Sequence, residues 1–498
     1  MSDPEAFLQA TEAPQNLKRT TVRGGSLVIV SQGLIFVLSL GATMVLARLL
    51  TPSDFGLVAM VTAVTALASQ FKDLGLSQAT IQRSTITHNQ VSTLFWINTT
   101  LGLALTLITV AAAPLLAWYY GDPRLVPITL ALAGTFLLSG LAVQHQALLR
   151  RQMRFGVLTA IDVLALVAGL ATALIMAWRG AGWWALVFRQ LAAAAVTTLG
   201  LWWACRWRPG RFRRGVGVRS MLTFGSHVSG YSLANYFARN LDRVLLGQRA
   251  GSDVVGLYSK AYQLLLLPIN MISSPLHAVA IPALSRLQGE PARYRSYYQK
   301  GMLLPVALGM PGVVFLFVTA GDAIRLFLGS QWMASVPIFR LLAPAAFVGT
   351  FSVATAWVYV SLGLTRRQLD WTLFATALTV IAFLVGVRWG APGMAIAVSA
   401  SYCALFYPGL LYCFRPTFLR VGDLLVALWR PALASLAAGV GCWLFGRAVL
   451  MTHPALLRFT LQGITYAALY ALFWVALPHG KQSLIEMRGT LRELRRGN

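Results

Sequence analysis

SMLTFGSHVSGYSLANYFARNLDRVLLG, residues 220–247, is long and apolar enough to cross a bilayer, yet it carries a series of polar and charged side chains. These recur in steps of three and four residues, which places them on one face of a helix: His227, Tyr231, Asn235, Arg239, Asp242 and Arg243. Ionisable groups within a membrane usually face a protein interior or a water-filled cavity. The stretch therefore predicts a helix that lines a transport pathway.

The composition of the whole chain indicates a membrane protein. Of 498 residues, 57% are hydrophobic and 11% are charged, and the mean hydropathy is +0.66. A water-soluble fold would have too little polar surface at these values, and apolar runs of about 20 residues, typical of transmembrane helices, recur along the chain. We predict an all-α, polytopic inner-membrane protein with about 14 transmembrane helices.

The net charge of +26 raises the alternative of a nucleic-acid-binding protein. However, most of the 41 Lys and Arg residues fall in alternate loops, on one side of the predicted membrane. This is the positive-inside distribution, which predicts that both termini are cytoplasmic and that nucleic acid is not a partner. The four cysteines form no CxxC pair and have no His partner, so we expect neither a metal site nor a cofactor.

The spans divide the chain into two lobes of six helices and two further helices. The expected parts are a cytoplasmic tail (1–22), an N-terminal lobe (23–204), a basic cytoplasmic linker (205–219), a C-terminal lobe (220–414), a last helix pair (415–478) and a basic cytoplasmic tail (479–498). The linker, CRWRPGRFRRGVGVR, is the most basic segment and suits the anionic headgroups of the inner leaflet.

A weak internal repeat relates the two lobes. VLARLLTPSDFGLVAM (45–60) and VLLGQRAGSDVVGLYS (244–259) both place Ser-Asp and then Gly-Leu after a long span. Ser-Asp suits a turn that caps the following helix, and the second copy has one extra residue before its Gly-Leu. Two copies that enter from the same side predict parallel repeats around an axis along the membrane normal.

The segments around this repeat resemble those of the polysaccharide branch of the multidrug/oligosaccharidyl-lipid/polysaccharide (MOP) exporter superfamily. The resemblance covers about residues 20–480 and rests on four motifs: LARLLTPSDFGL (46–57), FKDLGLSQATIQR (71–83), NYFARNLDRVLLGQ (235–248) and VVGLYSKAYQLLLLP (254–268). It implies a flippase that moves an undecaprenyl-pyrophosphate-linked oligosaccharide repeat unit across the bacterial inner membrane, for an exopolysaccharide (one of xanthan type would fit) or for O-antigen.

The resemblance further implies alternating access between the lobes and no covalent chemistry, so the chain would not be an enzyme. Implied partners are the lipid-linked oligosaccharide, membrane lipids, a polysaccharide polymerase and a chain-length regulator.

A pyrophosphate is a compact polyanion, and its transporter needs buried cations and donors that replace water. The candidates within the spans are Lys72, Arg189, Asn235, Arg239, Arg243 and Lys260, with Arg189 the deepest. Several have a structural alternative: Lys72 beside Asp73, and Lys260 near the outer interface, would be snorkelling cations, Arg239, Asp242 and Arg243 would form a local ion-pair cluster, and Arg189, with no acid nearby in its own span, would have a partner on another helix.

Transport also needs a driving force. The candidate ion-coupling residues are Asp73, Asp162, Asp242 and His227, of which Asp162 is favoured. The alternative is the membrane potential alone, which supplies about 2.3 kcal/mol per charge per 100 mV to an anion that moves outward.

Three other functions compete with this prediction. A cation-coupled multidrug exporter would favour an acidic or aromatic cavity, whereas the helix at 220–247 contributes more bases than acids. A membrane glycosyltransferase or polymerase would need an acidic motif of DxD type, which the sequence lacks. A peptidoglycan-precursor flippase has a similar substrate charge and crossing number, and only genetic context or substrate binding would separate it.

Overall fold

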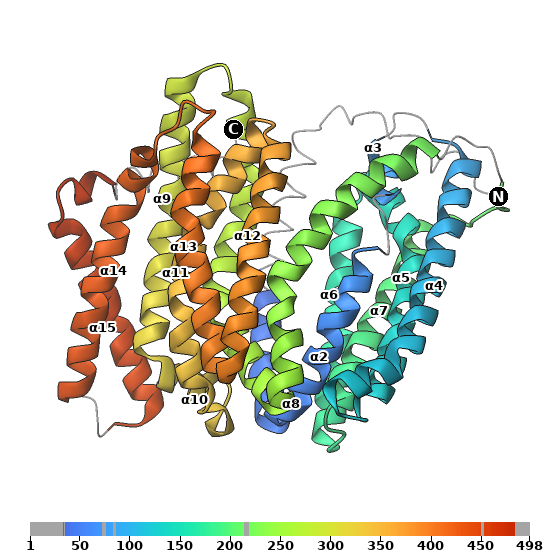
Figure 1. Ribbon diagram of the computed structural model, residues 1–498, viewed down its shortest axis with the longest axis horizontal. Coiled ribbons are helices and arrows are strands. Elements are labelled where there is room, and N and C mark those ends of the chain that lie inside the picture. Colours follow the sequence, from blue (N-terminus) through green and yellow to red (C-terminus); the bar gives the residue numbers. More distant parts are fainter. Residues whose placement is uncertain are drawn as a thin grey trace. The chain divides into compact units, whose positions relative to one another are not determined.

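The computed structural model describes residues 33, 35–71, 76–82, 86–213, 219–449 and 453–483, and all regular structure in this part is helical (Figure 1). After a helix over Ile35–Leu49, the first half contains α2 (Pro52–Ser69), α3 (Leu76–Gln82), α4 (His88–Tyr120), α5 (Leu125–Arg151), α6 (Phe155–Trp178), α7 (Trp184–Cys205) and α8 (Arg219–Arg286). The second half contains α9 (Pro291–Val318), α10 (Ala320–Phe327), η1 (Ser330–Trp332), α11 (Ser335–Ser361), α12 (Thr365–Gly386), η2 (Val387–Trp389), α13 (Gly390–Phe414), α14 (Val421–Val449) and α15 (Ala455–Ala476).

The helices confirm a multi-pass membrane protein. Ten helical segments are long and apolar enough to cross a membrane, and one of them, Thr365–Phe414, contains both α12 and α13. Separating these two, and adding the shorter apolar helix Ile35–Leu49 and the two halves of α8, gives fourteen helices besides the short α3 and α10 in the described part of the chain, compared with the predicted number of about 14. Large apolar side chains point outward along them; Ile108 of α4 is 62% exposed and Ile464 of α15 is 68% exposed. Such surfaces are stable only in contact with lipid.

Local sequence signals set several helix ends. Thr51 caps α2 and Thr87 caps α4, each in a capping box with the side chain three residues on. The predicted cap at Ser53-Asp54 is therefore two residues late, because Thr51 is the cap and Asp54 closes the box from inside the helix. Gly251 has φ 79° and ψ −179°, a conformation open essentially to glycine alone, and it divides α8 into two helices.

The chain forms two compact units, Met1–Gly256 and Leu257–Asn498. The first includes the first half of α8 in addition to the predicted lobe 23–204. Within it α4 packs against α5, and α7 against both α5 and α6. Gly102 and Gly140 let α4 and α5 approach closely, since a Cβ at Gly140 would lie 2.7 Å from the carbonyl oxygen of Asn98. Small residues at crossings are typical of membrane helix pairs.

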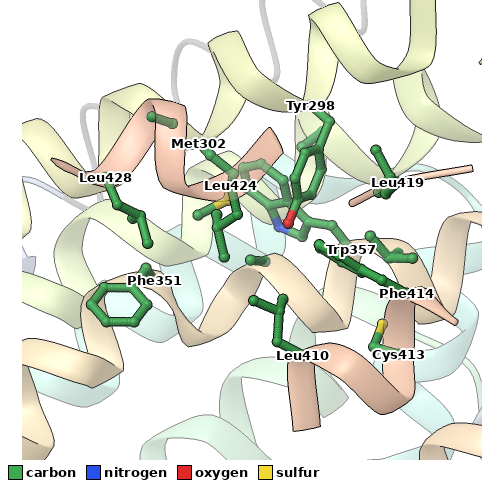
Figure 2. Packing of buried hydrophobic residues seen from close by; sticks show 14 of the residues in the cluster. Tyr298, Met302, Phe351, Trp357, Leu410, Cys413, Phe414, Leu419, Leu424 and Leu428 are labelled. Atoms are coloured by element: carbon green, nitrogen blue, oxygen red, sulfur yellow. The ribbon is translucent and has the colours of Figure 1, made fainter. Parts of the chain in front are cut away.

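The core of the second unit is built by the end of α8 together with α9, α11, α13 and α14, around Trp357 and Tyr298 (Figure 2). The indole N–H of Trp357 donates to Nδ1 of His277 at 3.1 Å, so the buried ring has its polar atom satisfied. Two ion pairs fasten the last helices to this core. Asp423 of α14 pairs with Arg295 of α9 at 3.1 Å, and Arg458 of α15 pairs with Asp322 of α10.

Candidate functional site

Several predicted site residues lie outside what the structure describes. Lys72 and Asp73 belong to the undescribed segment 72–75, and the tail 1–22 and residues 484–498 are also outside. His227, Asn235 and Arg239 lie within α8, as predicted, but their side chains are not described. Their roles remain predictions.

Arg189 is half-buried on α7 and faces α6. It lies in the second turn of α7, nearer to the helix end than its expected deep position, because the helix begins at Trp184. A Cβ at Gly169 of α6 would lie 2.9 Å from the carbonyl oxygen of Arg189 and 3.5 Å from its Cγ, so the glycine lets α6 approach the backbone of α7 closely at Arg189. Among the described residues, no hydrogen bond or ion pair engages its guanidinium. It is therefore a cation in an apolar helix pair with donor capacity to spare.

Asp242 and Arg243 lie near the end of the first half of α8. Asp242 is 2% exposed, and its Oδ1 accepts the backbone N–H of Arg243 at 2.8 Å. Arg243 is half-buried; its Nη1 lies 3.4 Å from Oδ1 of Asn240, and its buried Nε has no partner in the described structure. The hydroxyl of Tyr236, one turn earlier than Asn240, donates to the carbonyl of Ala63 and ties this half of α8 to α2. Within the described residues these contacts are hydrogen bonds and not an ion pair, so the predicted ion-pair cluster remains a prediction, and the Nε of Arg243 is an unused donor.

Lys260 belongs to the second compact unit. It is 8% exposed, and its Nζ donates to Oε1 of Gln263 at 3.2 Å. This burial argues against a snorkelling side chain, whose head would reach water.

Asp162 lies about two turns into α6, as predicted, and is exposed on the helix surface. The charged neighbour that acts on it is Arg150 at the end of α5. A carboxylate near an arginine is placed for ion coupling or for a local ion pair, so its coupling role remains a prediction.

The two copies of the repeat meet inside the first unit, a contact that sequence reasoning missed. The hydroxyls of Ser53 and Ser252 hydrogen-bond at 2.8 Å. A Cβ added at Gly56 would overlap the carbonyl oxygen of Ser252, and one added at Gly256 would overlap that of Pro52. The sequence shows that both copies share the Ser-Asp and Gly-Leu pairs. A shared motif indicates that two segments are similar, but it does not indicate that they are in contact.

Among the described residues, no group of three or more His, Cys, Asp or Glu side chains is placed to hold a metal ion. The four cysteines are free thiols.

Residues 45–337 match the sequence profile of the family described as polysaccharide biosynthesis protein. The chain belongs to this family. It is 25% identical over 453 residues to the lipopolysaccharide biosynthesis protein WzxC of Escherichia coli K12, which covers 86% of this chain and 88% of that protein. It is 27% identical over 282 residues to the teichuronic acid biosynthesis protein TuaB of Bacillus subtilis 168, covering 56% and 58% respectively. A third relative is the succinoglycan biosynthesis transport protein ExoT of Rhizobium meliloti, 24% identical over 65% of this chain and 66% of that protein.

Solved structures show the same fold. The lipid II flippase MurJ in an inward closed conformation aligns with a TM-score of 0.73 and 13% identity, covering 89% of this chain and 97% of that one. An inward-facing multidrug transporter of the MOP superfamily aligns with a TM-score of 0.61 and 17% identity, covering 77% and 94%. The fold is thus that of the MOP superfamily, as the sequence resemblance implies. These findings place the chain among transporters rather than enzymes.

Proposed function

We propose that this protein is a flippase for a lipid-linked oligosaccharide repeat unit, and that the lipid carrier is undecaprenyl pyrophosphate. The family match over residues 45–337 and the polysaccharide-related names of its relatives support the class of substrate. We place the protein in the inner membrane of a bacterium with both termini cytoplasmic, on the strength of its positive-inside charge distribution.

The observation that carries the transport mechanism is the state of two arginines in the first unit. Arg189 and Arg243 lie in membrane helices, and no carboxylate within the described residues forms an ion pair with either. An uncompensated cation is costly at that depth and is retained where an anionic ligand offsets the cost. Arginine also suits phosphate, because its planar fork donates two parallel hydrogen bonds. We assign both side chains to the passage of the pyrophosphate.

The proposed cycle alternates access between the two predicted lobes. Arg239, Asn235, Lys72 and Lys260 join the cationic path in this proposal, and Asp162, Asp242, Asp73 and His227 remain the candidates for coupling to an ion gradient. With the inside negative, the potential alone would also favour outward movement of an anionic headgroup. A polymerase and a chain-length regulator would consume the delivered unit.

The test is export of polymer in cells that lack the native gene and carry a plasmid copy. Arg189→Ala and Arg243→Ala should abolish export and cause labelled lipid-linked oligosaccharide to accumulate in the membrane, while Arg189→Lys should keep part of the activity. Arg179→Ala is the matched control, because Arg179 is exposed at the end of α6. Normal export by both alanine variants, at equal protein level, would refute the assignment.

The same cells separate the alternative functions. Rescue of a strain depleted of its lipid II flippase would favour the peptidoglycan precursor as substrate. Raised resistance to cationic drugs, lost with Asp162→Asn, would favour a multidrug exporter. The repeat-unit proposal expects neither result.

A further inference from the structure

The basic segment that follows α7 is folded back against the start of α4. Trp207 is 3% exposed, and its ring packs against Phe95, His145 and His88. Its indole N–H donates to Nδ1 of His88 at 3.2 Å, and its carbonyl oxygen lies 3.2 Å from Nε2 of His145. A tryptophan between two arginines would normally be exposed. Its burial fixes the position of the chain on either side.

The backbone of the segment is held at two further points. Ser92 accepts the N–H of Gly210 at 2.9 Å, and the indole of Trp96 donates to the carbonyl of Gly210 at 2.8 Å. Thr93 donates to the carbonyl of Arg213 at 3.1 Å. A Cβ at Gly210 would lie 2.8 Å from Nε2 of His88, so a larger residue there would have to displace the ring that accepts from Trp207. Residues 206–213 therefore have a defined path, which we call the docked segment.

The docked segment presents four exposed arginines, Arg206, Arg208, Arg211 and Arg213. Arg154, also exposed, joins them, since its Nη1 donates to the carbonyl of Ala204 at 3.3 Å. Between Asp122 and Asp242 the sequence contains one acidic residue, Asp162, and its charged neighbour is Arg150. Within the described residues, no ion pair neutralises any of the five arginines.

Exposed aromatic side chains accompany these charges. Trp203 is 78% exposed and Phe212 is 50% exposed. Tryptophan collects at the level of lipid headgroups, phenylalanine is found on the apolar face of segments that lie in the interface, and arginines next to them meet phosphate groups there. Duplex nucleic acid would meet the same arginines, but it offers nothing to cover the rings.

We propose that the docked segment is a binding site for the headgroups of anionic phospholipids in the cytoplasmic leaflet. The fixed backbone holds the arginines around the phosphate, and Phe212 and Trp203 enter the headgroup layer. This site is separate from the transport path, and its existence does not depend on the identity of the transported glycan.

The test compares binding of dansyl-labelled phosphatidylglycerol and phosphatidylcholine to the full-length protein in neutral detergent. We expect the protein to prefer phosphatidylglycerol at least tenfold, since each arginine near a membrane surface contributes about fivefold. The preference should weaken as salt rises, because exposed charges are screened. The variant R206Q/R208Q/R211Q/R213Q should reduce it to threefold or less. The matched control R179Q/R249Q/R388Q/R447Q removes four exposed arginines elsewhere and should retain it.

A second variant tests whether binding depends on the fixed path of the docked segment or only on its positive charge. S92A/G210V removes one anchor of the docked segment and places a side chain against His88, yet it keeps every arginine. Its preference for phosphatidylglycerol over phosphatidylcholine should fall at least threefold. Its melting temperature is measured as well, to show that the variant is folded. Three results would overturn the proposal: equal binding of the two lipids by the parent protein, equal loss in the control, or an unchanged preference in S92A/G210V. Tighter binding of a DNA duplex than of phosphatidylglycerol would do the same.

Discussion

Replacing Gly256 by alanine should separate the two copies of the repeat. In the structure each copy places the glycine of its Gly-Leu pair against a carbonyl of the other copy. A Cβ at Gly256 would overlap the carbonyl oxygen of Pro52 and lie 2.8 Å from its carbonyl carbon; a Cβ at Gly56 would overlap that of Ser252 and lie 2.5 Å from its carbon. Backbone atoms cannot rotate away from a new methyl group as a flexible side chain does, so the helices themselves must move.

The size of the effect follows from these distances. Non-bonded carbon atoms prefer separations of about 3.5–4.0 Å, so the crossing must open by about 1 Å or more. Overpacking of this kind costs about 1–3 kcal/mol. The same movement takes the hydroxyls of Ser53 and Ser252, now 2.8 Å apart, beyond hydrogen-bonding range, which costs about 0.5–1.5 kcal/mol. A total of about 1.5–4.5 kcal/mol shifts a conformational equilibrium roughly tenfold to about two thousandfold away from the closed crossing.

Disulfide formation between Ser53→Cys and Ser252→Cys reports how often the crossing is closed. The two Oγ atoms are close enough for cysteines at these positions to form a bond. We expect rapid oxidation in membranes that contain the double-cysteine protein, and a fall of at least tenfold in its rate when Gly256→Ala or Gly56→Ala is added. Free thiols are counted by maleimide gel shift, with the four native cysteines as the internal reference.

Gly134→Ala is the control, because Gly134 lies inside α5 and a Cβ there meets no atom within 4 Å. Like the other two variants, Gly134→Ala stabilises its helix by up to about 1 kcal/mol through the higher helix propensity of alanine, but its new methyl group contacts no carbonyl. The reasoning fails if Gly256→Ala and Gly56→Ala oxidise as fast as the parent, or if Gly134→Ala slows oxidation equally.

Three further predictions concern stability in detergent. Trp207→Ala should destabilise the protein by about 3–5 kcal/mol in thermal unfolding, because it empties the aromatic cluster around His145, whereas Trp203→Ala, at a site 78% exposed, should have little effect. Asp423→Asn should lower the free energy of unfolding by about 1–2 kcal/mol, because it removes a partly exposed ion pair with Arg295. Glu290→Gln, in an ion pair that is exposed on both sides, should be near neutral. Equal melting temperatures of the two variants would contradict this. Hydrogen bonds from Arg124 hold the pKa of Asp122 below its usual 3.8, so this carboxylate stabilises the fold fully at neutral pH and loses its effect as acid protonates it. Asp122→Asn should therefore reduce the fall in melting temperature below about pH 4. An unchanged fall in melting temperature would disprove this.

The sequence predicts the spans well because the bilayer imposes one strong requirement on each of them. The apolar run at 91–117 lies within α4, His88–Tyr120, and the run at 155–178 is α6. The apolar run at 54–76 does not match a single helix, since α2 stops at Ser69 and the separate helix α3 begins at Leu76. Hydropathy measures how apolar a segment is, and it does not register where a helix stops within an apolar run.

The candidate site was less predictable, because the partners of a side chain depend on packing between distant segments. Spacing on α8 grouped Asp242 with Arg243, and in the structure the carboxylate of Asp242 accepts the backbone N–H of Arg243. Spacing could not show that Gly169 lies close to the backbone carbonyl of Arg189 on the next helix. Nor could it show that Trp207, within the most basic segment of the chain, is a core residue. Such placements follow from tertiary contacts that leave no periodic trace in the sequence.

The contact between the repeats gives their shared motif a physical role beyond common ancestry. A single glycine would not permit the crossing, because each missing Cβ makes room for the carbonyl of the other copy, four residues before its own glycine. If the two copies are aligned by these contacts, Pro52 corresponds to Ser252 and Gly56 to Gly256. The sequence match aligns Ser53 with Ser252 instead, so the two alignments differ by one residue. The kink at Gly251 lies immediately before this segment, where the second copy departs from the regular helix. Close approach therefore requires a glycine at the same helical position in both copies, while the residues around it are free to diverge.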